Sequence, residues 1–105
     1  MSTKKDYIPS KVVMHKHGQL TVPKLLVAWR KCDGQSQKEF AKKIGISAAN
    51  LCDIEKGRKG LSLSKAAQVA NKIGYSPVAL VQLLIQDQIR DSGLNYSVEV
   101  RKRAA

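Results

Sequence analysis

The chain has 105 residues and a formal net charge of +11, from 19 Lys or Arg against 8 Asp or Glu. This length fits a single domain, and an aromatic content of 5% predicts a modest core built mainly from Leu, Ile, Val and Ala. No apolar run approaches the roughly 20 residues of a transmembrane helix, and the N-terminus has no apolar signal segment. The charge favours nucleic acid as the partner over an anionic membrane or a purely solubilising role, so we expect a cytoplasmic protein that binds no membrane.

Residues 1–20 are polar and basic, and we interpret them as an N-terminal arm. Within the arm, Lys11–His17 alternates as a short strand would. A disordered, solubilising arm is equally compatible with this composition. As the alternative, four lysines would enter a DNA minor groove or follow a phosphate strand: Lys4, Lys5, Lys11 and Lys16.

A helical domain is predicted over residues 21–92, and its first helix ends at Gly34. The apolar residues of this helix recur at helical spacing: Val22, Leu25, Leu26 and Trp29. The second helix starts at Ser36, because Ser36 and Glu39 form a capping box, and it ends at Gly45. Its apolar stripe consists of Phe40, Ala41 and Ile44.

A third helix is predicted from an N-cap at Ser47 to about Lys56, closed by Gly57. Its inward residues are Leu51 and Ile54. A fourth helix then begins near Ser62 and ends at Gly74. Its predicted buried face is Leu63, Ala66, Ala67, Ala70 and Ile73.

The fifth helix begins at Ser76 and Pro77 and reaches about Ser92. Its apolar residues cover more of the circumference than one core contact requires, so we expect something else to pack on it. Residues 93–105 form a basic tail in which Leu94–Val100 alternates as a half-buried β-strand. Because a lone strand is unstable, it should pair with Lys11–His17 or with the same segment of a second chain.

The second and third helices have the spacing of a helix-turn-helix. The small Ala41 suits a close helix crossing, and Gly45 suits the positive φ of a tight turn. The pattern SQKEFAKKIGIS followed by IEKG resembles the helix-turn-helix of the phage Cro and C1 repressor class, also called XRE-like. The segment SLSKAAQVANKIGYSP also looks like the fourth helix of that family. The resemblance covers about residues 22–80 and implies an all-α, lambda-repressor-like domain of five helices, here extended by the C-terminal β-strand.

The resemblance also implies roles for individual residues. The third helix would lie in the major groove, with base contacts from Ser47, Ala48, Ala49, Asn50 and Asp53. Phosphate contacts would come from Gln37, Lys38, Lys56, Arg58 and Lys59. Direct readout looks sparse, because Ala48 and Ala49 offer only methyl groups, for example to thymine, while Asp53 would accept from a cytosine amino group. Specificity would then depend partly on DNA shape and on the N-terminal arm.

From these features we expect a sequence-selective transcriptional regulator, a dimeric repressor from a bacterium or mobile element. The predicted dimerisation residues are Leu83, Leu84, Ile89, Tyr96, Val98 and Val100. The alternatives are an antitoxin whose tail binds a toxin, a protein-bridging cofactor that uses the fold to contact transcription machinery, and an RNA-binding protein. A protein partner would bind through the C-terminal helix and strand.

Catalysis, metal binding and cofactors are not expected. His15 and His17 alone are too few for a closed zinc site, and the sequence has no nucleophile–base set or phosphate-binding glycine loop. Cys32 and Cys52 are predicted to be free thiols.

Overall fold

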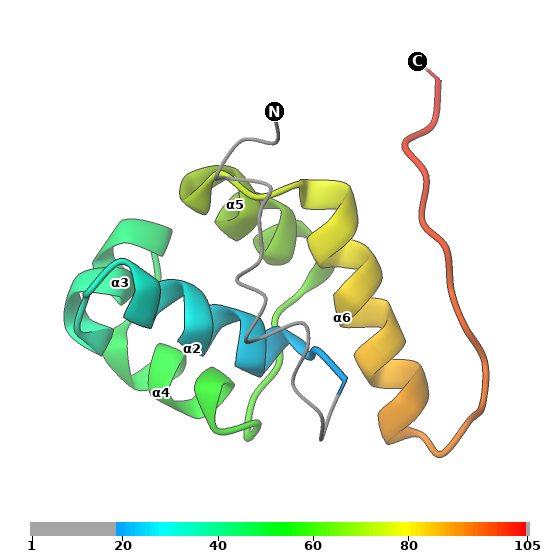
Figure 1. The fold of residues 1–105 in the computed structure, drawn as a ribbon, viewed down its shortest axis with the longest axis horizontal. Helices are drawn as coiled ribbons and strands as arrows, with labels where there is room; N and C mark the ends of the chain where they lie inside the picture. Colours follow the sequence, from blue (N-terminus) through cyan, green and yellow to red (C-terminus); the bar gives the residue numbers. More distant parts are fainter. Residues whose placement is uncertain (1–18, 105) are drawn as a thin grey trace.

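The computed structural model describes residues 19–104, and it confirms an all-α domain of five helices in this part of the chain (Figure 1). The helices are α2 (Val22–Cys32), α3 (Gln37–Ile44), α4 (Ala48–Glu55), α5 (Leu63–Ile73) and α6 (Pro77–Asp91). The predicted strand Lys11–His17, its histidines and the arm lysines lie outside the described residues.

Each helix begins at a side-chain cap, which explains why the boundaries could be predicted closely. The capping oxygens accept hydrogen bonds from the backbone N–H three residues later, and they belong to Thr21, Ser36, Ser47, Ser62 and Ser76. The capping box is present, since the Ser36 N–H also donates to Glu39 Oε1 at 2.8 Å. Helices α3 and α5 end at Gly45 and Gly74, both in the left-handed conformation at φ 81°.

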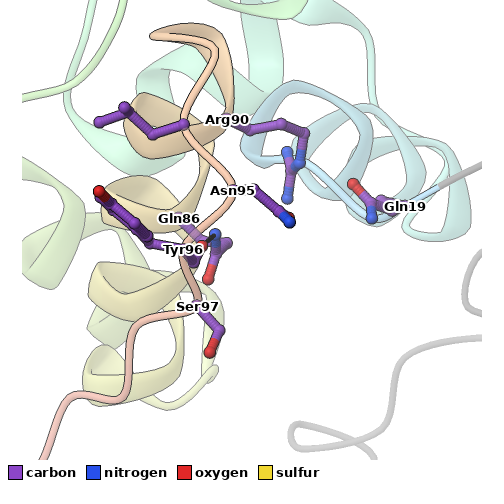
Figure 2. A pocket seen from close by; sticks show the side chains of 7 residues that line it. Gln19, Gln86, Arg90, Asn95, Tyr96 and Ser97 are labelled. Carbon is purple, nitrogen blue, oxygen red and sulfur yellow. Dashed lines mark hydrogen bonds between the residues drawn. The ribbon is translucent and has the colours of Figure 1, made fainter.

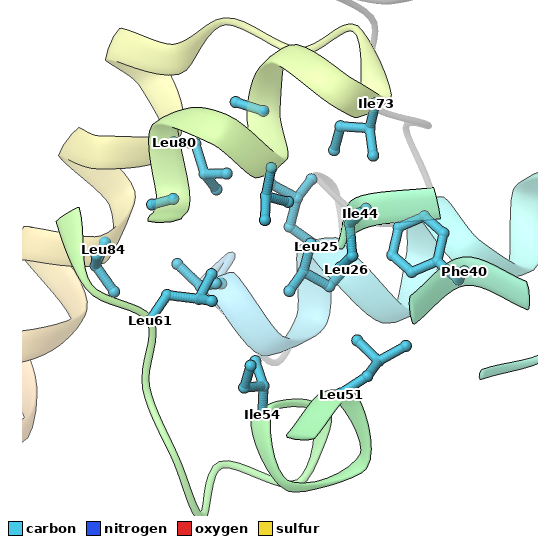
Figure 3. Close-up of a cluster of buried hydrophobic side chains, with 14 of the residues drawn as sticks. Leu25, Leu26, Phe40, Ile44, Leu51, Ile54, Leu61, Ile73, Leu80 and Leu84 are labelled. Atoms are coloured by element: carbon cyan, nitrogen blue, oxygen red, sulfur yellow. The ribbon is translucent and has the colours of Figure 1, made fainter. Parts of the chain in front are cut away.

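One hydrophobic core lies between the five helices (Figure 3). The predicted apolar residues of α3 and α4 are all buried in it, together with Val22, Leu25 and Leu26 of α2. The prediction for α5 was wrong at Leu63, which is 49% exposed, and it missed Val69, which is fully buried. Leu63 occupies the first position of α5, and Leu61 from the preceding loop fills the core at that end.

The predicted β-strand Leu94–Val100 is wrong, because the described residues contain no β-strand. The tail instead runs back along α6 as an extended segment (Figure 1). The Gln86 side chain donates to the Tyr96 carbonyl at 2.7 Å and accepts from the Val98 N–H at 2.9 Å. The Gln82 side chain accepts from the Val100 N–H at 2.9 Å. Two side-chain amides one helical turn apart thus replace the backbone of a partner strand, and the additional partner expected for α6 is the tail of the same chain.

Candidate nucleic-acid interface

Helices α3 and α4 form a compact unit around a tight turn. The Gly45 and Ile46 N–H groups both donate to the Ala41 carbonyl, at 2.9 and 3.0 Å, and Ala41 itself is almost fully buried. Helix α3 also packs on α5, and α4 packs on α2. The orientation of α4 is therefore set from two sides, as a helix-turn-helix requires.

A polar network on the inner side of α4 joins three helices. Arg30 of α2 binds Glu55 of α4 through two hydrogen bonds, Nε to Oε2 at 2.8 Å and Nη2 to Oε1 at 3.0 Å. Gln37 of α3 donates from Nε2 to Glu55 Oε1 at 2.8 Å. The Glu55 side chain is only 5% exposed. Burial acts to raise its pKa, but the hydrogen bonds from Arg30 and Gln37 and the charges of Arg30 and Lys31 hold the pKa of Glu55 below its usual value.

This network gives Gln37 a structural contact that the sequence did not show. The predicted phosphate anchor lies at the first position of α3, and Glu55 fixes its amide. Sequence reasoning treated Glu55 only as a helix-end residue and did not consider Arg30. No local sequence signal could have revealed the contact between Arg30 and Glu55, because these two residues are 25 positions apart.

The predicted base contacts lie along the accessible surface of α4. Ser47, Ala48 and Ala49 are exposed at its start, although the Ser47 hydroxyl also caps the helix through the Asn50 N–H. Asn50 and Asp53 are half-buried and lie one helical turn apart, which places them on the same face. The structure thus brings these predicted residues together on one helix surface.

The basic loop after α4 folds back toward that surface. Lys59 Nζ donates to Asn50 Oδ1 at 2.8 Å. Arg58 Nη1 lies 3.6 Å from Asp53 Oδ1. Two of the five predicted phosphate contacts, Arg58 and Lys59, are therefore each paired with a predicted base contact, a juxtaposition that the sequence analysis missed. Lys38 and Lys56 are exposed, and neither pairs with a carboxylate within residues 19–104.

No group of three His, Cys, Asp or Glu residues lies close enough to hold a metal ion within residues 19–104. No helix in the same range is long and apolar enough to cross a membrane. Cys32 is exposed, Cys52 is half-buried, and both are free thiols as predicted.

Comparison with known proteins identifies the same segment. The family model for the helix-turn-helix matches residues 29–80, from the last turn of α2 to the first turn of α6. A search of curated proteins and a search of solved structures returned no match. Through residues 29–80, the chain belongs to the helix-turn-helix family of DNA-binding regulators of the Cro/C1 type, also called XRE-like.

Proposed function

We propose that the protein is a sequence-selective repressor that binds duplex DNA with α4 in the major groove. The observation that carries this proposal is the fixed α3–α4 unit, whose accessible surface is bordered by the cationic loop Lys56–Lys59. A rigid helix can be inserted into the groove without a large ordering cost, and the lysines around it neutralise phosphates. The Gln37 amide and the N-terminus of α3 favour a phosphate contact beside it.

We further propose that two copies act together, so that two α4 helices reach successive major grooves. Leu84 does not belong to the dimer surface that we predicted, because it is 5% exposed within the core. Leu83, Ile89, Val98 and Val100 are half-buried. The accessible apolar groups on this side are Tyr96, which is 65% exposed, and Leu94, which is 48% exposed. Both border an open hollow of about 560 Å³ between α6 and the tail, toward which Arg90 and Asn95 also turn (Figure 2).

The proposed function is tested by selecting bound duplexes from a random DNA pool, with RNA as competitor. We expect an enriched motif with two-fold symmetry and half-sites about one helical turn apart. A preference for RNA, or no enriched motif, would contradict the proposal.

The dimer is tested by sedimentation of the variant carrying Leu94→Ser and Tyr96→Ser. We expect it to sediment as a monomer at concentrations where the parent protein is a dimer. The matched control is Leu63→Ser, since Leu63 is similarly exposed at 49% but belongs to α5 and not to the tail. Equal sedimentation of all three proteins would show that the tail is not part of a dimer interface.

A further inference from the structure

We infer that Arg58 reads a guanine base and that Asp53 is the positioning residue that aims it. This inference rests on the proposed function and refines it, because it replaces the phosphate contact that the sequence predicted for Arg58. It also replaces the direct cytosine contact predicted for Asp53.

The backbone at the end of α4 fixes where the Arg58 side chain starts. Gly57 adopts φ 78°, and its N–H donates to the Ile54 carbonyl at 3.0 Å. The Arg58 N–H donates to the Asp53 carbonyl at 2.8 Å. These two bonds form a Schellman motif, which turns the chain back over the last helical turn. Arg58 is therefore anchored on α4 itself and does not project from a free loop.

The side chains of the same two residues also meet. Arg58 Nη1 lies 3.6 Å from Asp53 Oδ1, while the Arg58 side chain remains 67% exposed. A guanidinium has five N–H donors, so contact with one carboxylate oxygen leaves donors for a second partner. An isolated Asp53 carboxylate would meet the negative potential of DNA, whereas the paired arginine presents a cation. The match for a planar pair of N–H donors in the major groove is guanine, through O6 and N7.

A second residue of the loop, Lys59, is also paired with this face of α4. Lys59 Nζ donates to Asn50 Oδ1 at 2.8 Å, one turn before Asp53. Asn50 and Asp53, on the accessible surface of α4, thus each bind a cation from the loop. The surface proposed to contact the bases therefore combines alanine methyl groups at the start of α4 with cationic donors toward its end.

The test is selection from the random duplex pool with the parent protein, Arg58→Ala, Asp53→Ala and the double variant. We expect Arg58→Ala to abolish a guanine preference at one position in each half-site, a loss of about 5- to 150-fold in discrimination. Asp53→Ala should relax the same position, and the double variant should be no worse than Arg58→Ala. Arg58→Lys should also lose the preference while retaining affinity for non-specific DNA, because it keeps the charge but not the planar donor pair.

The control is Lys56→Ala, which removes a neighbouring cation that has no carboxylate partner in the described part of the chain. It should weaken binding to all duplexes and reduce the salt slope by about one unit. The inference is overturned if Arg58→Ala behaves like Lys56→Ala, or if Arg58→Ala and Asp53→Ala act additively at different positions. In both cases an enriched parent motif would leave the proposed function standing, whereas a parent protein without any motif would overturn both.

Discussion

Replacing Arg30 by Met should destabilise the domain more than any surface change. The substitution removes two hydrogen bonds to Glu55, whose side chain is 5% exposed, and it removes the cation paired with that carboxylate. Glu55 then keeps only the hydrogen bond from the neutral Gln37 amide and the weaker effect of the Lys31 charge. Breaking a buried ion pair from one side costs about 3–5 kcal/mol. Small domains have only about 5–15 kcal/mol of stability in total. We therefore expect Arg30→Met to lose a large share of the free energy of unfolding.

The assay is urea unfolding followed by circular dichroism at pH 7, with three comparisons. Arg101→Met is the matched control, because its partner Glu99 is exposed and such pairs contribute about 0–1 kcal/mol. The double variant Arg30→Met with Glu55→Leu should recover much of the loss, since no unpaired buried charge remains. A loss below about 1 kcal/mol in Arg30→Met would refute the reasoning, because the ion pair would then behave as a surface pair. Equal losses in the single and double variants would refute it as well.

Three further predictions concern the same fold. Folding lowers the pKa of Glu55, so the stabilisation by its carboxylate is present above the unfolded pKa near 4.5 and is lost as pH falls through the folded pKa. In an acid titration, Glu55→Gln should therefore lose stability less steeply than the parent protein, and an equal slope would contradict this. Gln35 Oε1 is buried without a hydrogen-bond partner in the described residues. Gln35 directly precedes the N-cap of α3, and Phe40 is the fourth residue of that helix, which are the two positions of a hydrophobic staple. Gln35→Leu should therefore raise the urea midpoint by the equivalent of about 1–3 kcal/mol, and a lower midpoint would refute this prediction. Gln86→Ala removes the acceptor of the Val98 N–H, so hydrogen exchange of the Val98 amide, measured by NMR, should become faster. The Val100 amide, which donates to Gln82, serves as the internal reference. Unchanged protection at Val98 would show that the Gln86 contact does not hold the tail.

The sequence by itself determined the helices and their type of arrangement. Helix starts follow from a serine or threonine whose oxygen bonds a backbone N–H only three residues away. Helix stripes follow from the period of the helix. The spacing around Ala41 and Gly45 then identified the helix-turn-helix and, with the net charge, a nucleic-acid partner. The helix caps, the apolar stripes and the turn each depend on residues that are close together in the sequence. The net charge depends only on the overall composition.

Tertiary structure alone decided the contacts that give the interface its chemistry. Glu55 binds Arg30, which is 25 positions away in the sequence, and Gln37, which is 18 positions away. At such sequence separations, the periodicity of a helix does not predict which side chains come into contact. The alternation of Leu94–Val100 predicted a β-strand, and this prediction was wrong, because side-chain amides of α6 bind the backbone groups that a partner strand would have bound. The pairing of Arg58 with Asp53 depends on a backbone reversal at Gly57 that brings the two charges together. We infer from this pairing that Arg58, and not Asp53, meets the DNA.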